Sequence, residues 1–154
     1  TMHRIGVISD THGLLREEAR SLLASCELII HAGDVGNASI LRSLERISKV
    51  AAVRGNVDAG SWAQTLKPWE IVTIGTKKIF VIHRLGDMAV NPASEGIDAV
   101  VSGHSHRPDI RYKEGVLYLN PGSAGPRRFG LPVSLAFMET GPAGICPEIV
   151  ELRV

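Results

Sequence analysis

Apolar residues in the first third of the chain recur in short runs that are separated by segments of helical periodicity. The runs at residues 4–8, 27–31 and 49–53 have the length of buried strands. Between them, residues 14–24 and 38–47 place apolar positions three or four apart, with charged residues on the opposite side. Strands that alternate with helices in this way predict parallel strands joined by crossover helices.

From residue 70 onward the pattern changes to closely spaced strands with tight turns. Residues 70–74 and 78–83 flank Gly75-Thr76-Lys77, and Glu114-Gly115 separates two further short runs, so both stretches predict β-hairpins. The other segments are predicted strands at 98–102, 110–113, 116–119, 133–139 and 148–153, and loops at 57–68 and 123–132. About nine short strands and two or three helices are more sheet than one layer of this size holds. We therefore predict an α/β (α+β) fold of two packed mixed β-sheets flanked by helices, in a single domain over residues 1–154.

Composition limits the classes of function. The 154 residues carry 17 basic and 16 acidic side chains, a net charge of +1, which argues against a surface that binds long nucleic acids. The longest apolar runs are strand-sized, far below the roughly 20 residues of a membrane-spanning helix. Cys26 and Cys146 form no disulfide or metal motif, and the first residues lack a signal-peptide pattern. We expect a cytoplasmic protein, with no membrane partner, that acts on a small anionic molecule.

Residues that can bind a metal or an anion follow nearly every predicted strand. Any one of them alone is more often structural, as a histidine beside an apolar run or an aspartate that caps a turn. The carboxyl ends of parallel strands, however, meet at one edge of a sheet, so the whole set should converge in one pocket. In chain order the set is Asp10, His12, Asp34, Asn56, His83, His104, His106 and Asn120.

The first seven of these residues combine two carboxylates, one amide and four imidazoles. This mixed oxygen and nitrogen set suits manganese foremost, with iron, nickel, zinc and cobalt as alternatives, whereas magnesium or calcium would favour more carboxylates. Seven ligands exceed the needs of one tetrahedral ion, so we predict two divalent metal ions that share a bridging carboxylate. The two ions together outweigh the charges of Asp10 and Asp34, so the centre should attract an anion.

Several of these residues stand in recognisable motifs. Asp10-Thr11-His12, Gly33-Asp34, Gly55-Asn56, His83 and Gly103-His104-Ser105-His106 resemble, in order and spacing, the signature of the calcineurin-like metallophosphoesterase superfamily. Residues 53–58, and Asn120-Pro121-Gly122-Ser123 followed by Pro126-Arg127, look like its small single-domain microbial phosphodiesterase branch. The resemblance runs over residues 4–128 and is specific as a set rather than motif by motif.

The resemblance implies a four-layer αββα sandwich with two metals at one sheet edge. It also implies roles for the seven residues: Asp10, His12 and His106 hold the first ion, Asn56, His83 and His104 the second, and Asp34 bridges both. A hydroxide between the ions would attack the phosphorus of a small phosphate ester. Asp34, Asn56 and His104 are then the expected catalytic residues.

Two positions depart from the family pattern. Members that cleave phosphomonoesters often carry a histidine after the Gly-Asn pair, but this chain has Val57, so a familiar proton donor to the leaving group is missing. We therefore expect a phosphodiesterase rather than a phosphomonoesterase. Arg84 replaces the usual glycine after His83, and it could bind substrate phosphate together with Asn56, crowd the mouth of the site, or form a surface salt bridge.

A further group of residues is expected to support the ligands rather than to bind metal. His31, Arg54 and Asp58 belong here, although Asp58 could equally be a turn residue. Trp62 and Trp69 could form a lid, but packing or self-association is the favoured role, so a homo-oligomer is among the expected assemblies.

Two other classes of function remain as alternatives. The retromer subunit of this fold resembles the phosphoesterases yet works mainly by docking partner proteins, so a non-catalytic scaffold must be considered. A metal-bound sensor without turnover is the second. Scaffold members tend to lose ligands, whereas this chain keeps Asn56 and both residues of the Asp10–His12 pair, which favours an enzyme over a scaffold.

Overall fold

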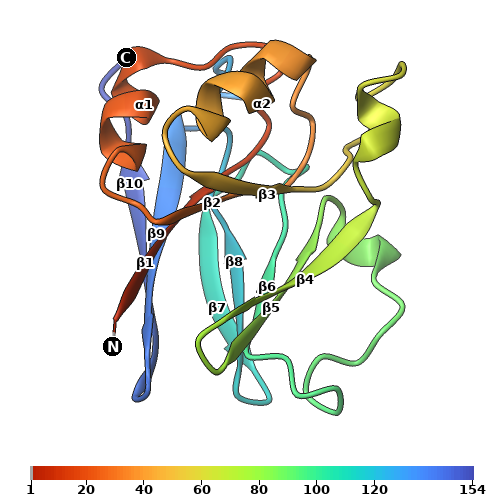
Figure 1. Cartoon of the computed structure of the whole chain (residues 1–154), viewed down its shortest axis with the longest axis vertical. Coiled ribbons are helices and arrows are strands. Elements are labelled where there is room, and N and C mark those ends of the chain that lie inside the picture. The colour runs from red at the N-terminus through yellow and green to blue at the C-terminus, as the bar shows by residue number, and fades with distance from the viewer. Residues whose placement is uncertain (1) are drawn as a thin grey trace.

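The structure is a computed structural model that describes residues 2–154 and consists of two packed β-sheets with helices on one side (Figure 1). Within those residues there are ten strands, two α-helices and two short 3-10 helices. In chain order they are β1 (His3–Ile8), α1 (Glu17–Leu23), β2 (Leu28–His31), α2 (Ala38–Glu45), β3 (Lys49–Ala52), a 3-10 helix (Ala63–Thr65), β4 (Trp69–Ile74), β5 (Lys77–Ile82), a 3-10 helix (Leu85–Asp87), β6 (Ala99–Val101), β7 (Asp109–Lys113), β8 (Val116–Asn120), β9 (Ser134–Gly141) and β10 (Gly144–Glu151).

Both sheets are mixed and have five strands each. The first has the order β10-β9-β1-β2-β3, in which β1, β2 and β3 are parallel and β9 and β10 are antiparallel additions. The second has the order β4-β5-β6-β8-β7, with β5, β6 and β8 parallel and the β4-β5 and β7-β8 hairpins at its two sides. The predicted pair of mixed sheets, the parallel strands of the first third and both hairpins are confirmed.

Alternation along the strands divides the apolar side chains into three cores. Ile5, Val7, Ile79 and Val81 are among the buried residues that fill the space between the two sheets. The opposite face of the first sheet packs against α1 and α2, which lie together on one side of it (Figure 1). The outer face of the second sheet is covered by the segment 83–97 with its single 3-10 turn. The outermost layer on that side therefore contains no α-helix within the described residues.

Two elements begin more than two residues from their predicted starts. Helix α1 begins at Glu17 rather than at residue 14, because His12 and Gly13 have positive φ angles and hold residues 10–16 in an irregular loop. Strand β10 begins at Gly144 rather than at residue 148, although it contains Pro147. Because β10 lies at the edge of its sheet, a proline is tolerated there. Among the described residues, no helix has the length and apolar character of a membrane span.

Candidate metal centre

Five of the predicted ligands meet where the ends of strands from both sheets face one another. Asp10 and His12 follow β1 and Asp34 follows β2, all in the first sheet, whereas His83 follows β5 and His106 follows β6 in the second. Within the described residues, their donor atoms form two groups in which every atom lies within 4.8 Å of the others: Asp10, His12 and His106, and Asp10, Asp34 and His83. The packing of the two sheets thus joins residues that are nearly 100 positions apart.

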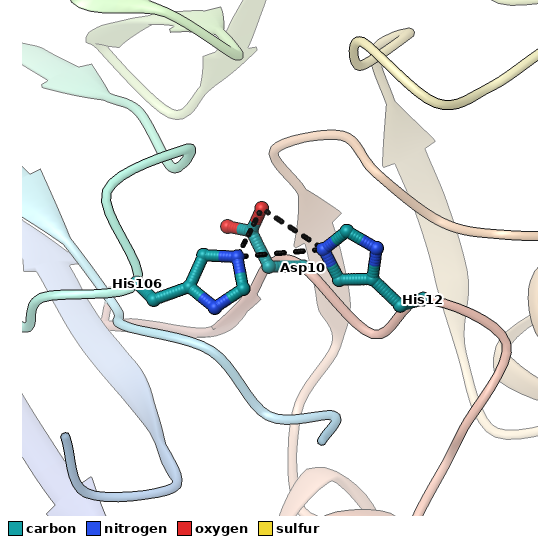
Figure 2. Close-up of side chains that lie close together, drawn as sticks. All are labelled: Asp10, His12 and His106. Carbon is teal, nitrogen blue, oxygen red and sulfur yellow. Dashed lines mark hydrogen bonds and ion pairs between the residues drawn. The ribbon is translucent and has the colours of Figure 1, made fainter. Parts of the chain in front are cut away.

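The first group is a compact triangle (Figure 2). Asp10 Oδ1 lies 3.7 Å from His12 Nε2 and 3.4 Å from His106 Nε2, and the two imidazole nitrogens are 3.4 Å apart. All three side chains point toward one another, and Asp10 and His106 are buried. These are the same three residues that the family resemblance assigns to one ion.

The second group shares Asp10 and adds Asp34 and His83. Asp34 Oδ2 lies 3.2 Å from His83 Nε2 and 3.7 Å from His12 Nε2, so this carboxylate stands between the two groups. Asp10 Oδ1 is also 3.9 Å from His83 Nε2. Both carboxylates therefore face both groups, which is the arrangement that a shared ligand needs.

Hydrogen bonds to the outer atoms of these side chains fix which atom points inward. Asp10 Oδ2 accepts bonds from Ser9 Oγ at 2.7 Å and from the His104 N–H at 3.0 Å, which leaves Oδ1 free. His83 Nδ1 donates to the Ala32 carbonyl at 2.8 Å, which presents Nε2 to the centre. Asp34 Oδ1 accepts from the Val57 N–H at 2.9 Å and leaves Oδ2 facing the histidines.

Two of the inward atoms are buried without a hydrogen-bond partner among residues 2–154, namely Asp10 Oδ1 and His83 Nε2. A buried polar atom without a partner is costly unless something satisfies it. Divalent cations of the manganese-to-zinc series bind carboxylate oxygens and imidazole nitrogens. In metal sites the second polar atom of each such side chain is commonly hydrogen-bonded, which orients the ligand atom, as it is here for Asp10 and His83. The residues therefore fit such an ion.

The backbone adopts an unusual conformation at the ligands. Seven non-glycine residues in the described part of the chain have positive φ, and five of them are predicted ligands: Asp10 (55°), His12 (46°), Asp34 (54°), His104 (72°) and His106 (63°). Left-handed conformations are uncommon outside glycine and cluster at functional sites. This concentration marks the strand ends as the functional part of the molecule.

Two glycines allow the ligand loops to pack against one another. A Cβ at Gly103 would lie 2.0 Å from Ser9 Oγ and 2.7 Å from Asp10 Oδ2, and a Cβ at Gly33 would lie 2.7 Å from His83 Nδ1. Each of these contacts joins a loop of one sheet to a loop of the other. The glycines before the ligands are therefore needed for close approach of the sheets.

The surroundings of Asp34 favour its ionised form. Burial alone would raise the pKa of Asp34, but the contact with His83, the Val57 N–H and the charge of His12 together bring the pKa well below its ordinary value. Burial opposes protonation of His83, whereas Asp34 and Asp10 favour it and raise its pKa overall. Asp34 is thus an anion at neutral pH, which is the state that a metal ligand requires.

Asn56 and His104 lie at the rim of the centre. Both are exposed, and the His104 ring stands edge-on to that of His83 with centroids 5.3 Å apart. Asn56 lines a cavity of about 230 Å³ together with His83 and Arg84. The structure therefore brings these two residues beside His83 without burying them.

Arg84 is exposed at the same rim. Its Nε lies 4.0 Å from Asp87 Oδ2, and the two side chains are 48% and 63% exposed, so this long ion pair contributes little. Arg84 also lines a second cavity that contains His104. It therefore borders the centre without closing it.

The predicted supporting residues have different surroundings. Asp58 is buried and accepts bonds from the backbone N–H groups of Val35, Gly36 and Gly55, so it ties the loop after β2 to the loop after β3. Arg54 is exposed and donates to the Leu66 carbonyl at 3.4 Å rather than to a predicted ligand, although it lines the same cavity as Asn56 and His83.

His31 is fully buried and belongs to a series of hydrogen bonds that links Gly33, Thr11 and Val35. Its Nδ1 accepts from the Gly33 N–H at 3.1 Å, its Nε2 is 3.0 Å from Thr11 Oγ1, and Thr11 in turn donates to the Val35 carbonyl at 2.8 Å. Burial is the main reason that the pKa of His31 falls to about 4. His31 is thus neutral and holds the two ligand loops of the first sheet together.

Several residues of the site had no distinctive signal in the sequence. Ser9 orients Asp10, and Ser123 Oγ donates to the Asp10 carbonyl from the loop after β8. Phe129 is 81% exposed, has a φ of 58° and stands edge-on to His106 with centroids 6.0 Å apart. Asn120 follows a strand, as predicted, but its amide donates to Gly103 O and Ser105 Oγ, so it supports a ligand loop.

One of the two tryptophans, Trp69, lines the same cavity as Asn56 and His83. Trp62 packs against the core between the first sheet and its helices, and Trp69 stacks on Phe80 with centroids 5.4 Å apart while remaining 47% exposed. A cavity of about 680 Å³ between the edge strands β3 and β4 contains none of the predicted ligands. That cavity is therefore separate from the predicted metal centre.

Comparison with known proteins supports the same picture. Residues 3–142 match the calcineurin-like phosphoesterase superfamily domain. A probable metallophosphoesterase of Methanocaldococcus jannaschii is 41% identical over 137 residues, which cover 77% of this chain and 67% of that protein. The phosphodiesterase YfcE of Escherichia coli K12 is 27% identical over 162 residues, which cover 90% and 88%. The structure of vacuolar protein sorting 29 from Cryptosporidium parvum has a TM-score of 0.83 at 22% identity, covers 99% of this chain and 92% of that one, and shows the fold alone.

Proposed function

Because this chain belongs to the calcineurin-like phosphoesterase superfamily, we propose that it is a phosphodiesterase that works with two divalent metal ions. The observation that carries the proposal is a pair of buried atoms without a hydrogen-bond partner within the described residues, Asp10 Oδ1 and His83 Nε2, at the meeting point of both sheets. The name of the E. coli relative, a phosphodiesterase, supports the preference for diesters.

The ligands divide between the two ions as the family resemblance implies. Asp10, His12 and His106 hold one ion, His83, His104 and Asn56 the other, and Asp34 is shared. Manganese is the first choice, with iron, nickel, zinc and cobalt as alternatives. When bound, two such ions supply a water of lowered pKa as nucleophile and positive charge for the phosphoryl oxygens.

The remaining residues position the substrate. Asn56 and Arg84 line the cavity beside His83, where an amide and a guanidinium donate hydrogen bonds to phosphate oxygens. The side chain of Val57 is 53% exposed at the same rim and offers no proton to a leaving group, while its N–H orients Asp34. Esters that need strong protonation of the leaving group are therefore poor substrates, which disfavours simple alkyl phosphomonoesters.

The decisive experiment is turnover by metal-stripped protein to which manganese, nickel, zinc or magnesium is added back. We expect hydrolysis of an aryl phosphodiester with manganese, and slower hydrolysis of an aryl phosphomonoester. Inactivity with every metal would exclude the enzyme and favour a non-catalytic scaffold, the alternative that the fold also permits.

A matched pair of variants tests the shared ligand. Asp34→Asn keeps the acceptor for the Val57 N–H but loses the charge, so turnover and metal content should both fall. Asp98→Asn is the control, because Asp98 also accepts a backbone N–H, that of Lys78, but lies outside the centre. Equal activity of the two variants would refute the role of Asp34.

The cytoplasmic location and the formation of a homo-oligomer remain predictions.

A further inference from the structure

A cavity of about 490 Å³ adjoins the candidate metal centre on its His104 side, and metal binding gives it no role. Its lining includes three arginines, Arg84, Arg107 and Arg111, together with Tyr118. Its volume lies within the range of about 300–1,000 Å³ that is typical of small-molecule sites. What the cavity binds must therefore be compatible with several guanidinium groups.

The β7-β8 hairpin forms one wall of this cavity. Arg111 is paired with Tyr118, and Asp109 with Asn120, across the two strands. Leu117 and Leu119 point into the core between the sheets, so the residues that alternate with them face outward. Cross-strand partners on one face lie close together, so Arg111 and Tyr118 present a cationic and aromatic surface.

Positive charge predominates in the cavity. Among its lining residues, three arginines face a single carboxylate, that of Asp109, which is 3.6 Å from Arg111. This pair is more than half exposed, and exposed ion pairs of this length contribute little. The side chain of Arg107 makes no ion pair or hydrogen bond with residues 2–154. An anion would therefore find guanidinium donors that are not committed elsewhere.

The cavity and the metal centre share a rigid loop. Asn120 Nδ2 donates to Gly103 O at 3.0 Å and to Ser105 Oγ at 3.1 Å, and Ser105 Oγ also accepts from the Arg107 N–H at 3.2 Å. These bonds fix the path from His104, at the metal centre, to Arg107, in the cavity. One ligand can thus reach both without rearrangement of the loop.

We propose that this cavity binds a second anionic group of the substrate, a phosphate or a carboxylate on the ester arm that extends past His104. The inference rests on the proposed phosphodiesterase function and narrows its substrate class to diesters with a charged arm. Arg107 and Arg111 bind the anion, and Tyr118 contacts the apolar part of the arm.

The test uses the metal-loaded chain and three 4-nitrophenyl phosphodiesters whose second arms have equal length and end in a phosphate, a carboxylate or a methyl ester. All products are quantified by chromatography, so that cleavage at either of the two ester bonds is included in the measured rate. The wild-type protein should give a kcat/KM about tenfold higher for a charged arm than for the methyl ester, as one charge-assisted contact provides. Discrimination by only one of the two anions identifies which group is bound.

The variant Arg107→Gln/Arg111→Gln should reduce this ratio to nearly one, and each single variant should reduce it in part. Arg42→Gln/Arg46→Gln removes the same charge from the exposed end of α2 and should leave the ratio intact. A wild-type ratio near one, or a ratio that survives in the Arg107/Arg111 variant, would overturn the inference while leaving the phosphodiesterase proposal in place.

If no probe is hydrolysed, the proposed function fails and the cavity is judged by binding. Calorimetric dissociation constants of the same three probes should then show the same preference, which the Arg107/Arg111 variant should lose. Equal dissociation constants for charged and neutral arms would overturn the inference.

Discussion

The two sheets contribute different groups to the same centre. Both carboxylates, Asp10 and Asp34, follow strands of the first sheet, whereas three of the four imidazoles, those of His83, His104 and His106, follow strands of the second. The first sheet is covered by two α-helices, and the second by the irregular segment 83–97. The more regular half therefore supplies the carboxylate oxygens, and the other half supplies most of the imidazole nitrogens.

Contacts across the boundary make the site depend on the docking of the sheets. The His104 N–H of the second sheet donates to Asp10, and His83 donates to the Ala32 carbonyl of the first. Each half thus orients a ligand of the other half. Neither half therefore holds a complete site. Loss of a carboxylate from the first sheet should affect metal content and activity differently from loss of an imidazole from the second.

Removal of one ligand from each sheet should have the largest effect. Asp10→Ala removes a buried anion that faces both groups, so we expect loss of both ions and a fall in kcat/KM of about 10³-fold. His104→Ala removes an exposed imidazole and should cost about 10²-fold with smaller loss of metal. Metal analysis after gel filtration and steady-state kinetics measure both. Equal loss of metal in the two variants would contradict the division between the sheets.

The buried supports of the ligand loops provide the next comparison. Asp58→Ala in the first sheet leaves the N–H groups of Val35, Gly36 and Gly55 without their acceptor and should lower the free energy of unfolding by about 3–4 kcal/mol. Asn120→Ala in the second sheet loses bonds at a half-exposed position and should cost about 1–2 kcal/mol. Urea denaturation of metal-stripped protein measures both values. A larger cost for Asn120→Ala would reverse the expected order.

His31 allows a test of the first sheet by pH. The folded protein protonates His31 only near pH 4, whereas a histidine in the unfolded chain titrates near 6.5. Between these values the unfolded state binds more protons, so the free energy of unfolding falls as the pH falls, by about 3 kcal/mol from this residue. The stability is fully present above pH 6.5.

The measurement compares urea denaturation of metal-stripped wild-type protein and His31→Gln at pH 7 and pH 5. The variant should lose less stability than the wild type between the two values, and an NMR titration of the His31 ring should give the pKa directly. An ordinary pKa near 6.5 would show that the buried hydrogen-bond chain through Thr11 is wrong.

The smallest effect is expected at Phe129, which has a left-handed backbone but is no predicted ligand. Phe129→Gly should stabilise the protein by up to about 1 kcal/mol, because glycine adopts a φ of 58° without strain. Phe129→Ala keeps the strain and should stay within about 0.5 kcal/mol of the wild type. Thermal unfolding of both variants distinguishes relief of strain from loss of the contact with His106. Destabilisation by glycine would show that the ring contact outweighs the strain.

Sequence patterns predicted the arrangement well where one local rule decided the outcome. Alternation, turn sequences such as Glu114-Gly115, and polar residues at strand ends were enough to place the strands and to bring Asp10, His12 and His106 to one site. The assignment of these three residues to a common ion came from the family resemblance. The late start of α1 could not be predicted, because it depends on left-handed residues that only the ligand loop requires. Ser9 and Phe129 gave no signal, since the role of each comes from a partner distant in the chain or from backbone geometry.

The five left-handed ligand residues also bear on how this protein can be altered. If each costs about 1 kcal/mol, together they consume about 5 kcal/mol of a total stability that is typically about 5–15 kcal/mol. Bound ions offset this cost because they bind only the folded state. A screen for thermostable variants without metal would therefore enrich glycine at positions such as His12 and discard activity. Selection in the presence of metal instead favours variants that keep the ligand residues, because metal binding then contributes to the measured stability. The presence of the ion therefore determines which mutations increase stability.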